Sequence, residues 1–504
     1  MTHETPTADM AGRSKVLGFT WGYWMLNGIE MFERLSYYLV RSVVAVYIMQ
    51  ADEVHGLHFS AAQKGTIYSL WFIFQSLLPT FTGGYADRYG YKKTLAFAIT
   101  LNVIGYVLMG TMTSYVGFSL AVVVLATGTA FFKPSLQGSL AQNVSKANSS
   151  LGWGIFYWVV NVGAAIGPIL ANFLRFGYGW QAVFFTSAAC MSLNYLMLFT
   201  FKDFESGADK TDGPLKVFLK TIRNLTDLRL VTWLLIMSCF WLMMYTLWDL
   251  QPNFLTDWND SGDVAGLFAR VPIVPDTWIV ETDRGLQVPQ ELLLNLNAVL
   301  IVALMIPVSW LVRKLKTLES MVIGMTMATA GVLVAGLSNV GFMFLLGVVG
   351  FSLGEMLTGP KKNEYLGLIS PPGKKGLYLG YVNIPVGLGG WFGSWLQGFV
   401  YGHWGEKAVL AQKYLVQKTE FAAGRVWDGG IGSLDAAAGV ARPEAFARMM
   451  EVTGLDAAGA TQVLWDTYSP QYAVWIPFAL IGFVAIIALV IFARMARRWS
   501  DMNA

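Results

Sequence analysis

Hydrophobic runs of about 20 residues or more recur along most of the chain, and short polar or charged segments separate them. About 20 apolar residues suffice for a helix to cross a bilayer, because a helix rises about 1.5 Å per residue. The pattern therefore predicts twelve membrane-spanning helices. Their approximate ranges are 17–49, 61–85, 93–113, 117–140, 151–175, 180–201, 229–256, 290–313, 319–338, 340–369, 376–402 and 471–496.

The longest loop on one side of this pattern, 203–228, divides the twelve spans into six and six. We therefore expect an all-α membrane protein with an N-terminal six-helix bundle over 1–202, a cytoplasmic linker over 203–228 and a C-terminal six-helix bundle over 229–504. Two insertions extend loops on the other side. Residues 257–289 contain a strand-turn-strand pattern that predicts a small β-hairpin, and 405–469 have the helical periodicity of a small cap.

Basic residues set the expected orientation. Most lie in loops on one side of the predicted membrane, at Arg13, Lys15, Arg88, Lys92, Lys93, Lys146, 210–229, 313–316, Lys374, Lys375 and 494–498. The positive-inside rule then places both termini in the cytoplasm of a multi-pass protein of the cell (inner) membrane. The short polar N-terminus leads directly into the first span, so we expect no cleavable signal peptide.

Composition supports the membrane class and narrows the chemistry. Of 504 residues, 55% are hydrophobic and only 13% are charged, whereas soluble proteins are about one quarter charged. A net charge of +3 does not indicate a nucleic-acid partner. With two cysteines and four histidines, we expect no metal, no cofactor and no enzyme site; the expected partners are the lipid bilayer and a small-molecule substrate of a monomeric protein.

The first span carries a polar stripe. Its residues are spaced at threes and fours, which places them on one face of a helix: Glu30, Glu33, Arg34, Tyr37, Tyr38 and Arg41. Charges are costly in contact with lipid, so they face a protein interior or a water-filled cavity and are functional candidates. The stripe predicts a transport pathway. Together with Lys133 in the fourth span, these charges could instead serve only to hold helices together.

Two motifs resemble known families. The loop Gly83-Gly84-Tyr85-Ala86-Asp87-Arg88-Tyr89-Gly90-Tyr91-Lys92-Lys93 is similar to the loop signature of the major facilitator superfamily, which implies a conformational latch at Asp87 and Arg88. The stripe of the first span resembles the signature of the proton-dependent oligopeptide transporters within that superfamily. Further matches in the same order are Gly128–Pro134 with Lys133, Phe156–Gly163 with Asn161, Asn297 with Pro307, and Gly354-Glu355 before Pro360.

The resemblance implies a major facilitator fold of two six-helix bundles and a symporter that imports di- and tripeptides with protons by alternating access. Substrate-binding residues would be Arg34, Tyr37, Tyr38, Arg41, Lys133, Asn161, Asn297 and Glu355. The acid at 355 would receive the amino terminus of the peptide, and the basic residues its carboxylate. Glu30, Glu33, Arg34 and Lys133 form a cluster that can hold a titratable proton, and water entering the cavity would change its binding.

Two departures leave alternatives open. Asp249 lies one residue earlier than the usual acid of the seventh span, and we expect it to form an outer gate with Arg41. Lys361, Lys362 and Glu364 follow Pro360, where they either anchor the helix at the membrane surface or favour a more anionic substrate. The alternatives are a relative that carries another anionic or zwitterionic metabolite, and a transporter-derived receptor that binds ligand through its cap.

Overall fold

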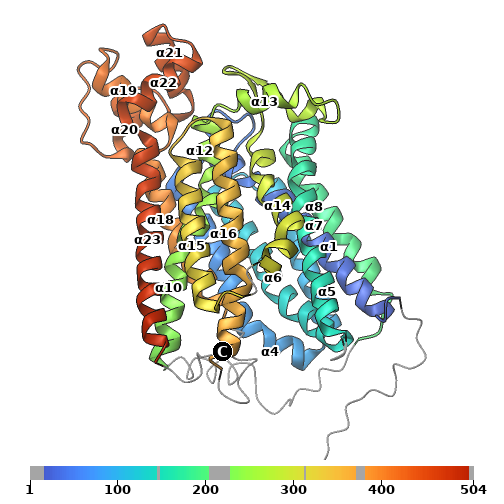
Figure 1. The fold of residues 1–504 in the computed structure, drawn as a ribbon. Coiled ribbons are helices and arrows are strands. Elements are labelled where there is room, and N and C mark those ends of the chain that lie inside the picture. The colour runs from blue at the N-terminus through green and yellow to red at the C-terminus, as the bar shows by residue number, and fades with distance from the viewer. Residues whose placement is uncertain (1–15, 145–147, 204–226, 312–313, 371–380, 499–504) are drawn as a thin grey trace, which may run out of the picture.

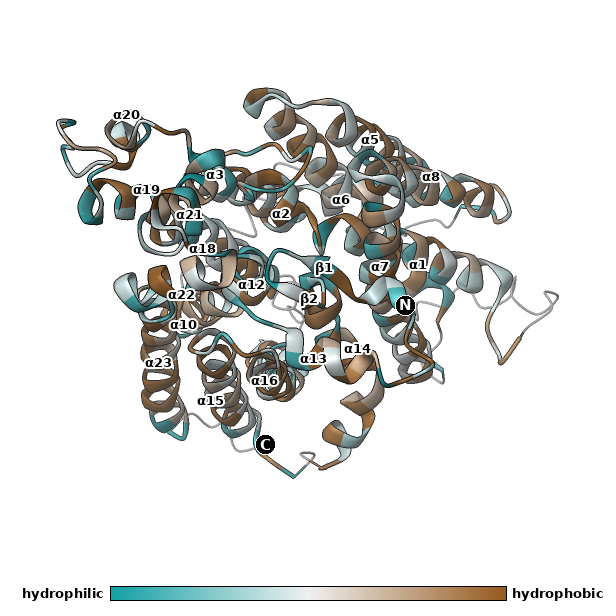
Figure 2. Ribbon diagram, turned by 90° about the horizontal axis from the view of Figure 1, so that it is seen from above, coloured by the Kyte–Doolittle hydropathy of each residue, from teal (hydrophilic) through white to brown (hydrophobic). Residues whose placement is uncertain are grey.

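The computed structural model describes residues 16–144, 148–203, 227–311, 314–370 and 381–498. Long helices run side by side along one axis (Figure 1). Short helices gather at one end of this bundle, which we call the cap end; α4 (Pro79–Tyr89) and the last turns of α23 (Pro470–Ala496) lie at the opposite end, which we call the tail end. Viewed from above the cap end, α1, α7 and α8 lie on one side and α10, α15 and α23 on the other (Figure 2).

The helices that precede residue 203 form the N-terminal bundle. They are α1 (Trp21–Arg41), α2 (Val44–Met49), α3 (Ala61–Phe72), the π-helical turn η2 (Ile73–Leu77), α4 (Pro79–Tyr89), α5 (Tyr91–Thr111), α6 (Tyr115–Asn143), α7 (Ser149–Tyr178) and α8 (Trp180–Leu198). The C-terminal bundle contains α10 (Leu228–Met244), α11 (Thr246–Asp249), α12 (Gln251–Trp258), α14 (Gln290–Leu311), α15 (Thr317–Gly336), α16 (Gly341–Leu368), α18 (Asn383–Trp404) and α23 (Pro470–Ala496).

Nine helices in the described part of the chain are long and apolar enough to cross a membrane. The predicted spans 17–49, 61–85 and 376–402 correspond to α1 with α2, to α3 with η2 and α4, and to α18, and these segments are not among the nine. The polar stripe gives α1 its high charge, and η2 divides the second segment. The count of twelve spans therefore stays a prediction, and most of the linker 203–228 lies outside the described residues.

The turn η2 follows from a proline. Pro79 has no N–H, so the carbonyl four residues before it loses its helical donor. Directly before the proline, the amide of Leu78 donates to the carbonyl of Ile73, five residues back, at 3.3 Å. Single π-helical turns of this kind occur frequently at functional sites, and this one places Gln75 on the wall of the central cavity described below.

Both insertions lie at the cap end. The first holds α13 (Gly262–Phe268) and an antiparallel pair, β1 (Val280–Thr282) with β2 (Gly285–Gln287), in which Glu281 lies opposite Leu286. Gly285 has a φ of +91°, which favours glycine at the turn. The second holds α19 (Lys407–Lys418), α20 (Leu434–Ala438), α21 (Ala445–Thr453) and α22 (Ala457–Tyr468). Short 3₁₀ turns cover Asp276–Trp278, Ile431–Ser433 and Arg442–Glu444.

Helices α1 and α7 pack unusually closely, which fixes the polar stripe against the fifth span. A Cβ atom added to Gly163 would lie 2.8 Å from Cβ of Arg34, and one added to Gly167 would lie 2.8 Å from Cβ of Tyr38. Small residues four apart let two membrane helices approach in this way. The glycines of α7 therefore help to set where the stripe lies.

The first prediction tests this packing. Gly167→Ala would place its new methyl group against Tyr38, and overpacking of this kind typically costs about 1–3 kcal/mol. We expect a thermal midpoint several degrees lower for the purified protein in detergent. Gly154→Ala in the same helix is the control, because its Cβ meets no atom within 4 Å and alanine favours a helix by about 1 kcal/mol. Equal midpoints for the two variants would contradict the packing argument.

Candidate functional site

A cavity of about 310 Å³ lies between the two bundles. Seven of the residues selected from the sequence line it: Arg34, Tyr37, Tyr38, Arg41, Asn161, Asn297 and Glu355. The lining also includes side chains that sequence reasoning missed, most of them aromatic: Gln75, Tyr157, Trp241, Tyr245 and Trp248. Aromatic side chains in apolar helices are usually interpreted as packing, and Pro79 four residues after Gln75 was the available signal for that side chain.

The basic wall of the cavity is built around Arg34. Its guanidinium donates two hydrogen bonds of 2.5 Å to the carboxylate of Glu33, and its Nε lies 3.5 Å from Oε1 of Glu30. The ring of Tyr37 lies 4.8 Å from the guanidinium carbon. Two carboxylates thus hold one guanidinium at the cavity surface, as the spacing of the stripe predicts.

Lys133 of α6 also belongs to the cluster formed by Arg34, Glu33 and Glu30. Its Nζ lies 3.4 Å from Oε1 of Glu30, which is fully buried. The other oxygen of Glu30, Oε2, has no hydrogen-bond partner among the described residues. Lys133 is not among the residues that line the cavity, so in this conformation it acts on the cavity through Glu30 and Arg34.

The acidic wall comes from the other bundle. Oε2 of Glu355 in α16 accepts a hydrogen bond of 3.0 Å from Asn297, which also donates to Ser352 at 3.0 Å. Nζ of Lys362 lies 4.2 Å from the ring centre of Trp241, a residue of the cavity lining. The cavity therefore has Arg34 on one side and Glu355 on the other. Lys362 lies outside the lining, against the ring of Trp241.

The remaining predicted polar residues are divided between the cavity and its surroundings. Nδ2 of Asn161 donates to the carbonyl of Tyr157 at 2.8 Å. Lys361 pairs with Glu364 at 2.8 Å and is not among the residues that line the cavity. Arg88 is exposed near the tail end, and the side chain of Asp87 lies outside the described residues, so the latch stays a prediction.

An ion pair joins the bundles at the cap side of the cavity. Arg41 of α1 contacts the carboxylate of Asp249, and both side chains are buried. Arg41 also donates to the carbonyl of Trp248 at 3.3 Å. That carbonyl lies four residues before Pro252, which has no N–H to offer it. The seventh span is broken there, and the arginine of the first span supplies the missing donor.

Lys64 of α3 strengthens the same junction and was missed by sequence reasoning. Its Nζ contacts the carbonyl of Asp249 and lies 2.6 Å from Oδ1 of Asn253. Ser394 of α18 donates to Asp249 at 2.9 Å. A lone lysine near the start of an apolar span was the available signal, because such a charge needs a partner inside the protein.

A second ion cluster lies closer to the cap surface. Arg175 of α7 pairs with Glu53 at 2.6 Å, and its Nη1 lies 3.4 Å from Glu291 at the start of α14. Glu291 is fully buried and also accepts a 3.3 Å hydrogen bond from Asn172. The arginine and the two acids come from three separate loops or helix ends, so no local motif could have shown their proximity.

The helical cap contributes a third connection. Arg442 belongs to the C-terminal half, yet its guanidinium contacts the carbonyls of Met49, His58 and Phe59 in the N-terminal half. The same guanidinium forms an ion pair with Glu406, which is 3% exposed. Hydrogen bonds and ion pairs thus close the cap end of the molecule from the cavity to the outer surface.

Comparison with known proteins places this geometry in a class. Residues 29–269 match the model of the Major Facilitator Superfamily. "Uncharacterized transporter YclF" of Bacillus subtilis (strain 168) is 27% identical over 182 residues, which are 35% of this chain and 36% of that protein. "Dipeptide and tripeptide permease B" of Aliivibrio fischeri (strain MJ11) is 29% identical over 169 residues, 32% of each chain. The chain spans about a third of the length of these relatives.

Solved structures match over nearly the whole chain. A POT family transporter in complex with a thioalcohol-conjugated peptide has a TM-score of 0.66 at 14% identity and covers 97% of this chain and 98% of its own. The nucleoside transporter NupG has a TM-score of 0.66 at 11% identity and covers 94% and 99%. At these identities the structures show the fold alone.

The class follows from these findings: the protein is a multi-pass membrane protein with the major facilitator fold. Part of its sequence is similar to the Major Facilitator Superfamily and to a protein named as a dipeptide and tripeptide permease, which confirms the resemblance read from the motifs. The matched relatives are named as a transporter and a permease, in agreement with the prediction that the protein is not an enzyme.

The second prediction concerns the Arg41–Asp249 pair. Removing one partner of a buried ion pair typically costs about 3–5 kcal/mol, and here only the closed cap end holds the pair together. We expect Asp249→Asn to shift the protein toward a conformation that is open at the cap end. Spin labels at the exposed positions Val54 and Ile273, in a background lacking Cys190 and Cys239, would report this as longer distances.

The matched control is Glu451→Gln, which removes an exposed pair with Arg448 on the cap. Exposed pairs contribute about 0–1 kcal/mol, so this variant should keep the wild-type distances. If Asp249→Asn changed neither the distances nor the uptake of substrate, the pair would not be a gate.

The third prediction concerns pH and the cap. Burial raises the pKa of Glu406 to about 7, although the charge of Arg442 acts in the opposite direction. When the cap is unfolded or detached, the pKa of Glu406 returns toward its usual value of 4.5. Glu406 therefore binds a proton more tightly when the cap is folded against the bundle. Proton binding by Glu406 therefore stabilises the folded cap fully below pH 4.5, and this stabilisation is lost as the pH rises through 7.

Thermal unfolding between pH 4.5 and 8 measures this effect. We expect stability to fall across this range by on the order of 1–3 kcal/mol more in the wild type than in Glu406→Gln, which cannot titrate. Glu444→Gln, a nearby exposed acid, should follow the wild-type profile. Identical profiles for Glu406→Gln and the wild type would show that Glu406 does not couple the cap to pH.

Proposed function

We propose that the protein is a proton-coupled symporter that imports di- and tripeptides, or peptide-like zwitterions, by alternating access. The single observation that supports this most directly is the central cavity, where Arg34 from one bundle and Glu355 from the other line a common space of about 310 Å³. A zwitterion presents one charge to each wall. Its carboxylate meets the guanidinium and its ammonium meets the carboxylate, and both interactions strengthen in a site shielded from water.

The rest of the lining suits short peptides of varied sequence. Tyr37, Tyr38, Tyr157 and Trp241 offer aromatic surface with polar edges, which packs against many side chains. Asn161 and Asn297 supply amide groups that can bond a peptide backbone. Small-molecule sites usually combine a mostly apolar wall with a few polar groups in this way.

Coupling to protons has a structural candidate in Glu30. Its Oε1 lies near Arg34 and Lys133, whereas its Oε2 has no partner among the described residues and is free to carry a proton. Protonation would weaken the hold of Glu30 on both cations and leave Arg34 freer to bind a substrate carboxylate. Each inward proton brings about 2.3 kcal/mol per 100 mV of membrane potential to the transport cycle.

Alternating access requires a gate on each side of the cavity. The cap end would be the outer side, in line with the distribution of basic residues, and Arg41, Lys64 and Asp249 would form its gate. The motif at Asp87 and Arg88 would serve as the latch of the cytoplasmic side. Arg442 ties the cap to the opposite bundle, so the insertion 405–469 would add to outer closure.

A second substrate class has one observation in its favour. Lys362 lies against Trp241 at the edge of the cavity and adds a cation that a neutral zwitterion does not require. This charge favours a metabolite with a net negative charge, such as a small dicarboxylate or a zwitterion with an additional acid. The two candidates differ in whether the ammonium group is needed for binding.

Counterflow in proteoliposomes is the fourth prediction and tests the proposed function. Vesicles loaded with unlabelled dialanine should accumulate labelled dialanine, and an inward proton gradient should drive net uptake. Glu355→Gln should weaken binding at least about tenfold, because a hydrogen bond to a charged group contributes about 1.5–3 kcal/mol. Glu30→Gln should retain counterflow, which needs no net proton movement, and lose gradient-driven uptake.

Glu364→Gln is the control for Glu355→Gln, since this acid lies two turns further along α16 and pairs with Lys361 outside the cavity. It should behave like the wild type. No response to any member of a panel of di- and tripeptides would refute the peptide assignment, and a response to small dicarboxylates in the same assay would establish the second class.

A further inference from the structure

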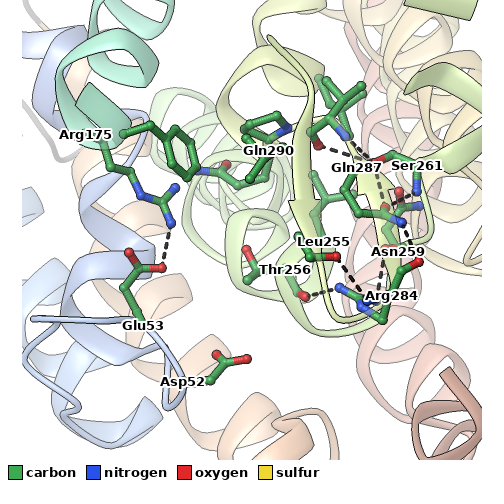
Figure 3. A pocket seen from close by; sticks show the side chains of 16 residues that line it. Asp52, Glu53, Arg175, Leu255, Thr256, Asn259, Ser261, Arg284, Gln287 and Gln290 are labelled. Atoms are coloured by element: carbon green, nitrogen blue, oxygen red, sulfur yellow. Dashed lines mark hydrogen bonds and ion pairs between the residues drawn. The ribbon is translucent and has the colours of Figure 1, made fainter. Parts of the chain in front are cut away.

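A second cavity, of about 230 Å³, lies at the cap end, and the proposed function leaves it unused. We call it the cap-end pocket (Figure 3). Asp52 and Glu53 from the loop after α2 and Arg175 from the end of α7 line one side. The other side consists of Thr256, Asn259, Ser261, Arg284, Gln287 and Gln290, which belong to the C-terminal half. Each bundle thus supplies one wall.

The pocket has a rigid C-terminal wall. Arg284 donates to the carbonyls of Thr256, Asp257 and Asn259, at 2.7, 3.4 and 3.1 Å. Gln287 accepts from the amide of Ser261 at 2.7 Å. These bonds pin the β1–β2 hairpin over the end of α12, and Figure 3 shows them on one side of the open space.

The charges of the pocket are only partly paired. Arg175 pairs with Glu53 at 2.6 Å and with Glu291 at 3.4 Å. Among the described residues, Arg284 has no carboxylate within ion-pair distance, and its three bonds to carbonyls leave two of its five N–H donors available. Asp52 likewise has no cation within ion-pair distance in the described part, and its contact is a 3.1 Å hydrogen bond from Gln50.

Asp52 is ionised at neutral pH. Burial raises its pKa, but the charge of Lys407 and the hydrogen bond from Gln50 outweigh burial, so the pKa lies below its usual value. The pocket therefore presents an exposed carboxylate on the N-terminal side, at Asp52, and a guanidinium on the C-terminal side, at Arg284, and in the described part of the chain neither forms a close ion pair. Leu255, Val288 and Leu293 supply apolar surface between them.

Two neighbouring amides also have unused hydrogen-bonding capacity. Asn259 and Gln290 are each 5% exposed. Neither side-chain polar atom of Asn259, nor Oε1 of Gln290, has a partner among the described residues. Buried polar groups are normally satisfied, so a polar ligand that enters the pocket gains donors and acceptors as well as charges.

We propose that the cap-end pocket binds a small zwitterion, of amino-acid or dipeptide size, with its ammonium group at Asp52 and its carboxylate at Arg284. A bound ligand bridges the two bundles and so stabilises the conformation that is closed at the cap end. The ligand class is that of the proposed substrate, and to this extent the inference rests on the proposed function. The site itself is separate from the central cavity.

Equilibrium dialysis of the full-length protein in nanodiscs, with labelled dialanine as the probe, tests the site. Wild-type protein should bind two molecules. Asp52→Asn should weaken one of the two sites at least about tenfold, and Asp52→Glu should restore it. Glu355→Gln should weaken only the other site. Glu281→Gln is the matched control, since this exposed acid lies on the same hairpin and does not line the pocket.

The outcomes separate the two proposals. Loss of one site in Asp52→Asn, with N-acetyl-dialanine insensitive to the same substitution, supports an ammonium at Asp52. If Asp52→Asn binds two molecules like Glu281→Gln, the inference is wrong and the central site stands. If Asp52→Asn abolishes all binding and Glu355→Gln has no effect, the inference stands and the peptide assignment of the central cavity fails. No saturable binding to the wild type overturns the inference.

Discussion

A charge buried in a bilayer must have a partner, and this constraint shapes the protein from its first helix onward. Arg34 is held by two glutamates of its own helix, and one of them, Glu30, also pairs with the lysine of α6. Arg41 has no acid on α1 within reach and finds one on the opposite bundle. The same polar stripe therefore contributes both to the internal cohesion of one bundle and to the contact between bundles. A change in how the two bundles sit against each other can break the second kind of pair while it keeps the first.

The closed end of the molecule is built in layers that share this logic. Arg41, Lys64 and Asp249 lie nearest the cavity, Arg175 with its two acids lies further out, and Arg442 lies at the surface. Each layer combines a cation with groups from both halves. Because the free energies of separate contacts add when the contacts are distant and independent, several modest layers can hold a closed conformation that no single pair would hold alone.

The sequence predicted the helical architecture, the β-hairpin and seven residues of the cavity lining, because apolar runs, turn residues and helical spacing are local patterns. It also predicted that Asp249 would lie near Arg41. It could not predict Lys64 against Asp249 or Arg442 against the loop before α3, since these pairs depend on how the bundles and the cap meet. The number of membrane spans was hardest to predict at two places. Charged residues interrupt the apolar run of α1, and η2 separates α3 from α4. The roles of the site residues remain predictions.

Pro252 gives the closed end a property that its charges alone would not provide. The proline leaves a carbonyl of the seventh span without a partner inside its own helix, and Arg41 supplies that partner from another helix. Separation of the bundles would thus uncover a bare backbone oxygen as well as a carboxylate. Both groups would then need water or another donor in place of Arg41, so the proline adds a backbone group to the polar contacts that favour the closed cap end.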